Sequence, residues 1–108
     1  MSDYFIPLMV HGDLQYRADA FVTDIVPTAP WRIIVDARGK FIYVRRLMKD
    51  GSNQNLGRLV YNGDTENMPF AIFRNRTGKY DSKGDFSGAQ YLDGTLEGAI
   101  RAILESYP

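Results

Sequence analysis

Hydrophobic residues recur at every second position over most of the chain, a period that indicates β-strands with one apolar face. The clearest alternation covers residues 14–22. Its apolar positions are Leu14, Tyr16, Ala18, Ala20 and Val22. Residues 4–10 are predicted to pair with it as an edge strand, where the missing N–H of Pro7 is harmless. With residues 11–13 as the turn, we expect a β-hairpin at this end of the chain.

Residues 31–36 and 40–47 are predicted to form a second hairpin around a three-residue loop, 37–39, that ends on glycine. The expected register sets Val35 opposite Phe41 and assigns each side chain to one of two sheet faces. The first face carries Trp31, Ile33, Val35, Phe41, Tyr43 and Arg45. The second face carries Arg32, Ile34, Asp36, Lys40, Ile42, Val44 and Arg46. Because the second face is too apolar for a purely solvated surface, we expect it to contact a partner.

Residues 57–61 and 70–75 are predicted as two further strands, and the glycine-rich segment 78–88 as a mobile surface loop. Towards the end of the sequence the hydrophobic period becomes helical. The apolar stripe consists of Leu96, Ala99, Ile100, Ile103, Leu104 and Tyr107. Asp93 or Thr95 is suited to be its N-cap. The predicted fold is therefore one α+β domain over residues 1–108, a mostly antiparallel β-meander of about six strands packed by one C-terminal amphipathic helix.

The residue content argues against most kinds of catalytic site. The chain has no cysteine and one histidine, His11, which excludes thiolate zinc sites, disulfides and cysteine nucleophiles. We expect His11 to be a solvated turn residue. No phosphate-binding glycine loop, dinucleotide fingerprint or nucleophile motif is present. We therefore predict no catalytic residues, no metal and no cofactor, and we expect a cytoplasmic protein without a membrane segment.

Formal charge is zero overall but uneven along the chain. Residues 1–30 hold one basic and four acidic side chains, residues 31–80 hold ten basic and four acidic, and residues 81–108 hold two basic and five acidic. This order gives either a dipolar surface or a neutral one with interspersed ion pairs. Interspersed charge is the commoner arrangement on protein surfaces.

The basic middle segment supplies the candidate contact residues for a partner or a nucleic acid. They are Arg32, Arg38, Lys40, Arg45, Arg46, Lys49, Arg58, Arg74 and Arg76. Aromatic residues lie between them, as in sheets that bind single strands by stacking bases and neutralising phosphates. The competing interpretation is that Trp31, Phe41 and Tyr43 are buried beneath the C-terminal helix, which needs an apolar surface to cover. We expect burial for these three rings.

These observations support three hypotheses of function. The leading one is a non-enzymatic interaction module that binds another protein, or a second copy of itself, through a sheet face or edge. The second is a nucleic-acid-binding domain that uses the basic sheet segment 31–80. The third is a small ligand-binding or enzymatic domain with residues 78–88 as a lid.

Overall fold

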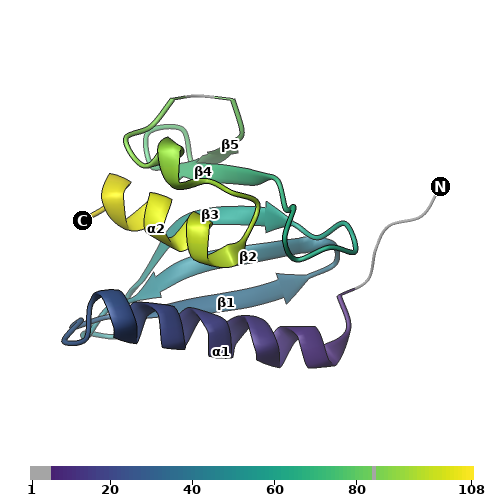
Figure 1. Cartoon of the computed structure of the whole chain (residues 1–108). Coiled ribbons are helices and arrows are strands. Elements are labelled where there is room, and N and C mark those ends of the chain that lie inside the picture. The colour runs from purple at the N-terminus through teal and green to yellow at the C-terminus, as the bar shows by residue number, and fades with distance from the viewer. Residues whose placement is uncertain (1–5, 84) are drawn as a thin grey trace.

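The computed structural model describes residues 6–83 and 85–108. It begins with helix α1 (Leu8–Ile25) and ends with η1, a short 3-10 helix (Ala89–Tyr91), and helix α2 (Leu96–Ser106), with a sheet between them (Figure 1). The strands are β1 (Arg32–Arg38), β2 (Phe41–Leu47), β3 (Asn53–Val60), β4 (Phe70–Arg74) and β5 (Lys79–Asp81). Each strand pairs antiparallel with the next, so the sheet order is β1-β2-β3-β4-β5. The predicted α+β class and antiparallel meander are confirmed, although the described chain has five strands and two α-helices.

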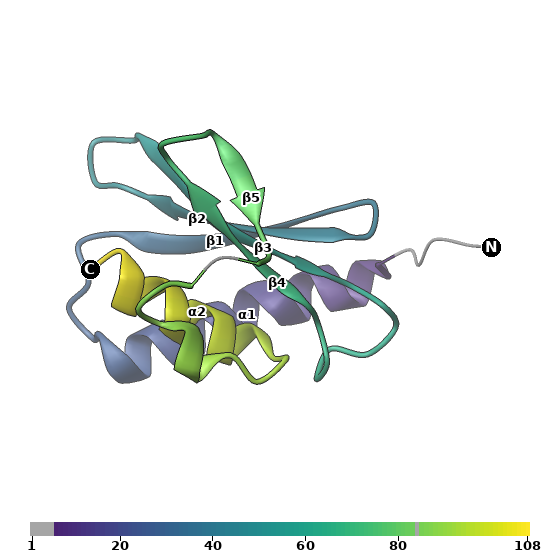
Figure 2. The same cartoon turned by 90° about the horizontal axis from the view of Figure 1, so that it is seen from above.

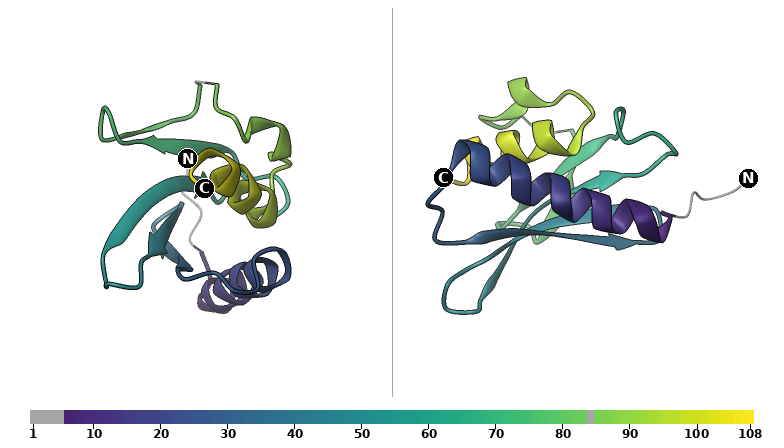
Figure 3. Two further views of the ribbon diagram at one scale, coloured as in Figure 1. Left: turned by 90° about the vertical axis from the view of Figure 1, so that its left-hand side faces the viewer. Right: turned by 60° about the horizontal axis from the view of Figure 1, so that its bottom comes forward.

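Both α-helices pack on the same face of the twisted sheet, and the opposite face is uncovered (Figures 2 and 3). Helix α1 runs along β1 at one edge, while α2 lies beside α1 and faces the middle strands (Figure 1). One core fills the space between the helices and the sheet. Its fully buried side chains include Leu14, Ile33, Ile42, Val44, Leu56, Leu59, Leu96, Ile100 and Ile103. This two-layer arrangement leaves one face of the sheet without a covering helix.

The predicted first hairpin is wrong within the described residues, because residues 8–25 form the single helix α1. The buried residues of this helix are Leu14, Ala18 and Val22, which are four positions apart. A spacing of four residues fits one face of a helix and also fits the alternation of a strand, so the pattern alone did not distinguish the two. Tyr16 is exposed on the outer side of the helix. Pro7 is the residue that precedes the helix and not part of an edge strand, which suits a residue without an N–H. Residues 4 and 5 of the predicted strand lie outside the described part.

The second hairpin is confirmed as a hairpin, but its predicted register is wrong. Arg38 pairs with Phe41, which leaves a two-residue turn in which Gly39 has a φ of +60°. Val35 therefore lies opposite Val44 and not opposite Phe41. The observed pairing differs from the predicted one by three residues. Because this number is odd, the side chains of β2 that were expected on the same sheet face as Val35 lie on the opposite face. Phe41 and Tyr43 consequently lie on the uncovered face, and the prediction that α2 buries them is wrong.

The C-terminal helix is confirmed with its predicted cap and apolar stripe. The Thr95 hydroxyl accepts a hydrogen bond from the Gly98 N–H at 3.0 Å, and Asp93 in turn accepts from the Thr95 N–H and hydroxyl. These bonds satisfy donors that the first helical turn leaves free. Leu96, Ala99, Ile100 and Ile103 are fully buried on the sheet side of the helix.

The outer edge of β1 is covered by one side chain of α1. The Gln15 amide donates to the Ile33 carbonyl and accepts from the Val35 N–H, each at 2.9 Å. A carboxamide in this position imitates the backbone of a neighbouring strand. It therefore blocks this stretch of the edge, from Ile33 to Val35, against pairing with another chain.

Candidate functional site

The uncovered sheet face combines arginines with aromatic rings. The pairing register and the alternation of side chains place two groups on this face. The arginines are Arg32, Arg38, Arg45 and Arg58. The aromatic residues are Phe41, Tyr43, Phe73 and Tyr80. Four strands and the short β5 thus bring together residues that are up to about fifty positions apart in the sequence.

The aromatic rings form one connected group across β2, β4 and β5. The Tyr43 ring centroid lies 5.9 Å from that of Phe41 and 5.6 Å from that of Tyr80. Phe73 and Tyr80, which are opposite each other in the β4–β5 pair, have centroids 5.0 Å apart. Tilted and edge-on contacts at these distances are favourable and hold the rings in defined orientations. All four side chains are partly exposed.

Arg58 extends from β3 into this aromatic group. Its guanidinium carbon lies 4.2 Å from the centroid of the Phe41 ring and 4.9 Å from that of Tyr80. The Arg58 Nε is buried and has no hydrogen-bond partner among the described residues. Such an orphan donor costs free energy unless water or a ligand satisfies it. The Arg58 guanidinium is therefore held between two rings, and its Nε–H remains without an acceptor among the described residues.

Beside the rings the face is hollowed by a cavity of about 300 Å³. Its lining residues are Asp36, Arg38, Tyr43, Arg45, Asn55 and Tyr80. The Arg45 Nε donates to Asp36 Oδ2 at 2.8 Å, and Arg45 also donates to Asn53. Arg38 is exposed and makes no hydrogen bond or ion pair within the described part of the chain. Burial raises the pKa of the Tyr80 phenol, so this residue stays neutral at physiological pH.

The structure divides the predicted contact residues into two groups. Arg38, Arg45 and Arg58 meet on the uncovered face, with Lys40 at its border, where the ammonium lies 5.5 Å from the centre of the Phe41 ring. The others form ion pairs or lie away from this group. Arg32 pairs with Asp19 at the α1 edge, and Arg74 pairs with Asp81. Lys49 and Arg76 are exposed in the turns that follow β2 and β4.

Arg46 does not belong to any exposed surface. It is only 5% exposed and lies on the helix-covered face with Ile42 and Val44, so the predicted second contact face does not exist. Its guanidinium donates to Gln54 and to the Tyr107 carbonyl, and it lies 5.2 Å from the Trp31 ring. Trp31 was predicted to be buried beneath the C-terminal helix, and it is partly buried against the core. Burial lowers the pKa of this arginine. Arg46 therefore joins the end of α2 to the sheet.

The chain matches no protein-family model, no curated protein and no solved structure. Its function is therefore argued from geometry and charge alone.

Charge is divided between the two layers of the fold. The uncovered face carries four arginines and one carboxylate, that of Asp36. The helix layer has the opposite excess. In α1 and α2 the acidic residues are Asp13, Asp19, Asp24, Glu97 and Glu105, and the basic residues are Arg17 and Arg101. The helices therefore carry an acidic excess on the side of the sheet opposite Arg38, Arg45 and Arg58, while the Arg32–Asp19 ion pair joins the two layers at the β1 edge.

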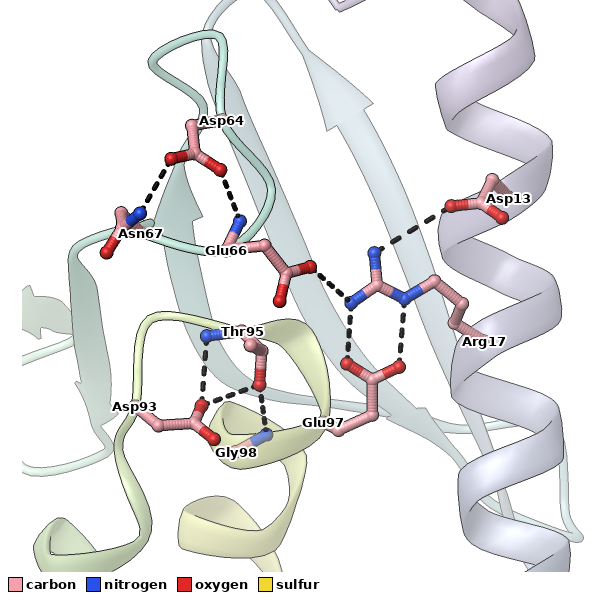
Figure 4. A network of polar contacts seen from close by, with 9 residues as sticks. All are labelled: Asp13, Arg17, Asp64, Glu66, Asn67, Asp93, Thr95, Glu97 and Gly98. Atoms are coloured by element: carbon pink, nitrogen blue, oxygen red, sulfur yellow. Dashed lines mark hydrogen bonds and ion pairs between the residues drawn. The ribbon is translucent and has the colours of Figure 1, made fainter.

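A second polar cluster, around Arg17, joins the two helices (Figure 4). Its guanidinium makes a two-pronged contact with Glu97, at 2.8 and 2.7 Å, and reaches Asp13 and Glu66 at 3.8 and 3.7 Å. Within the described residues no group of acidic or histidine side chains is arranged to hold a metal ion. His11, which the sequence placed in a turn, lies in α1 and contacts the Ile6 carbonyl. The Arg17 cluster is thus a structural contact between helices.

The Arg17 contact predicts a defined loss of stability in acid. The hydrogen bonds from Arg17 hold the pKa of Glu97 below its ordinary value of 4.5. A depressed folded-state pKa contributes stability above pH 4.5, and this contribution is lost as the pH falls through the folded-state value. Urea unfolding should therefore show that Glu97→Gln removes about 1 kcal/mol at pH 7 and much less near pH 3. Glu105→Gln, an exposed substitution in the same helix, is the control, and an equal loss at both pH values would contradict the assignment.

Four residues of the hollow were not among the predicted contact residues: Asp36, Tyr43, Asn55 and Tyr80. Asp36 was placed on the predicted second face, and Tyr43 was expected to be buried. The signal for Asp36 was a carboxylate inside an otherwise apolar strand, between Val35 and Ala37. Asn55 lies between the strands predicted at 40–47 and 57–61, whereas β3 begins at Asn53. A bulge between Val44 and Arg45 sets Asn55 opposite Arg45 and so directs it to the same face.

No helix in the described part of the chain is long and apolar enough to cross a membrane.

Proposed function

We propose that this protein binds single-stranded nucleic acid through the uncovered face of its sheet. The observation that carries the proposal is the position of Arg58, whose guanidinium lies between Phe41 and Tyr80 on a face that neither helix covers. Arg38 supplies an unpaired cation beside the same rings. Together these groups match the two parts of a nucleotide, a base with flat apolar faces and a charged phosphate.

The form of the surface favours a single strand over a duplex. Aromatic side chains contribute to binding by stacking on bases, and only unpaired, splayed bases offer their faces. The face is also a twisted sheet about five strands wide and not a projecting helix or ribbon that could enter a groove. The acidic helix layer faces away, so an approaching polyanion is directed towards the sheet.

The proposal predicts binding that weakens steeply with salt. Fluorescence anisotropy with labelled single-stranded oligonucleotides of about ten residues, at about 50 and 200 mM salt, measures it directly. Arg38→Gln should weaken binding to all sequences similarly and reduce the slope of log affinity against log salt by about one unit. The cause is the loss of one phosphate contact.

Arg101→Gln is the matched control for this experiment. Arg101 is an exposed arginine that lies over the Tyr91 ring, at 4.9 Å, but on the helix side of the molecule. It should bind with wild-type affinity and slope. If Arg38→Gln and Arg101→Gln behave alike, the sheet face is not the binding surface.

Protein binding remains the second candidate, and the outer side of α1 favours it. Leu8, Met9 and Tyr16 are 85%, 81% and 72% exposed, which is unusual for side chains of this size on one helix. The sheet edge at β1 offers less, because Gln15 already occupies its backbone groups. A chain that binds no oligonucleotide under the conditions above would leave α1 as the surface to investigate.

The third hypothesis, a lid over an active site, has little support. Residues 79–81 of the predicted mobile segment form β5, which pairs with β4 and holds Tyr80 within the aromatic group. At the end of the segment the Gly88 N–H donates to the Ser106 hydroxyl of α2, and the Asp85 carbonyl accepts from Arg74 of β4.

A further inference from the structure

Among the described strand residues, Asp36 is the one acidic side chain on the face that carries the arginines and the aromatic group. A carboxylate repels phosphate, so the binding function proposed above gives it no role. Its ion pair with Arg45 is partly exposed, and pairs of this kind contribute little stability. Asp36 also lines the hollow beside Tyr43 and Tyr80, which is where a bound nucleotide would lie. The position of the carboxylate therefore needs a different explanation.

One oxygen of Asp36 is available to a ligand. Oδ2 accepts the hydrogen bond from the Arg45 Nε, whereas Oδ1 has no hydrogen bond with any described residue. The Arg45 contact holds the carboxylate in place because Arg45 is itself held by Asn53. A fixed carboxylate with a free oxygen is an acceptor for a hydroxyl or an N–H.

The neighbours of Asp36 indicate which part of a nucleotide it would meet. On β1 the next residue on the same face is Arg38, and across the β1–β2 pair Asp36 lies opposite Tyr43. The carboxylate is thus adjacent both to a cation suited to phosphate and to a ring suited to a base. In a nucleotide the sugar lies between the phosphate and the base, and only ribose presents a 2′-hydroxyl donor there.

We infer that the hollow lined by Asp36, Arg38 and Tyr43 is a ribose-selecting subsite, in which the Asp36 carboxylate accepts a hydrogen bond from a 2′-hydroxyl. This inference rests on the proposed function and makes it more specific: the preferred ligand is single-stranded RNA. A DNA strand would leave the carboxylate without a donor and close to phosphate, so the same residue both favours RNA and disfavours DNA.

The test compares oligomers that differ only in the sugar. Labelled oligomers of about ten uridines and of about ten 2′-deoxyuridines are titrated with the full chain in fluorescence anisotropy at one moderate salt concentration. The wild type is expected to bind the RNA about tenfold more tightly, the ratio that one hydrogen bond to a charged group supplies. Asp36→Ala should reduce this ratio to about one, mainly because DNA binding is no longer disfavoured and the RNA contact is lost.

Two controls separate this contact from other causes of RNA preference. A 2′-O-methyl oligomer keeps the RNA-like sugar conformation but has no hydroxyl donor, so the wild type should bind it about as weakly as DNA. Asp19→Ala removes a different carboxylate that is also paired with an arginine, Arg32, outside the hollow. It should keep the full RNA preference, which shows that a change of net charge alone is not responsible.

The outcomes distinguish this inference from the proposed function. Equal binding of RNA and DNA by the wild type, or an RNA preference that survives Asp36→Ala, overturns the ribose subsite while the binding function stands. Tight binding of the 2′-O-methyl oligomer also overturns it. Absence of binding to every oligomer overturns both proposals. Circular-dichroism melting of Asp36→Ala confirms that the comparison is made with folded protein.

Discussion

Arg58→Met is expected to weaken oligonucleotide binding by about tenfold to a hundredfold while leaving the fold intact. The guanidinium carries the positive charge of the aromatic group and the unsatisfied Nε donor, and methionine has neither. Loss of one stacked cation and its phosphate contact accounts for an effect of this size. Methionine keeps an unbranched stem that still packs between Phe41 and Tyr80, so the free energy of unfolding should change by less than about 1 kcal/mol.

The measurement is anisotropy at low salt, accompanied by a urea unfolding curve for the same sample. Arg101→Met provides the matched control, since it removes an arginine that also lies over a ring but belongs to α2. Wild-type affinity in Arg58→Met would show that the aromatic face has another purpose. In contrast, a double change of the adjacent Arg45 and Arg46 would be a poor test, because the second residue is buried and supports the end of α2.

Gly88→Ala is expected to destabilise the protein by about 3 kcal/mol. A Cβ at this position would lie 2.0 Å from the Ala102 carbonyl oxygen and 2.6 Å from its carbonyl carbon, both backbone atoms of α2. No side-chain rotation can relieve this overlap, so the segment between β5 and α2 must move away from the helix.

Gly12→Ala is the internal comparison for this substitution. Gly12 lies within α1, and a Cβ there would meet no atom within 4 Å among the described residues, apart from its chain neighbours and the backbone of its own helix. Alanine has a higher helix propensity than glycine, so this variant should be more stable by up to about 1 kcal/mol. Chemical denaturation of both variants therefore separates steric overlap from backbone preference. Similar stabilities for Gly88→Ala and the wild type would mean that residues 85–91 do not pack on α2 in solution.

The two proposals depend on how the helices are distributed. A sheet with helices on both faces would bury Phe41 and Tyr43, and a sheet with the helices on the other face would expose Ile42 and Val44 in their place. Both helices lie on one face of the sheet (Figure 3), so the acidic side chains of α1 and α2 belong to the layer opposite Arg38, Arg45 and Arg58. The same packing thus determines the hydrophobic core, the uncovered aromatic group and the direction of the charge.

Local patterns determined part of this structure. Helix α2 was predictable because its apolar stripe has helical spacing and Thr95 is an efficient cap. The strands around Gly39 were predictable as well, since alternating apolar residues flank a position that favours glycine. Residues 31–80 did show the mixture of arginine and aromatic residues that the uncovered face carries, but burial of Phe41 and Tyr43 was expected in place of their exposure.

Tertiary structure decided the remainder, for two physical reasons. Leu14, Ala18 and Val22 satisfy a strand period and a helix period equally, and only packing of α1 against β1 selects the helix. The register of β1 and β2 depends on whether the turn between them has two or three residues. This difference of one residue in turn length decides whether Tyr43 faces the core or solvent. The hollow around Asp36 then arises from four strands at once, so no local stretch of sequence contains it.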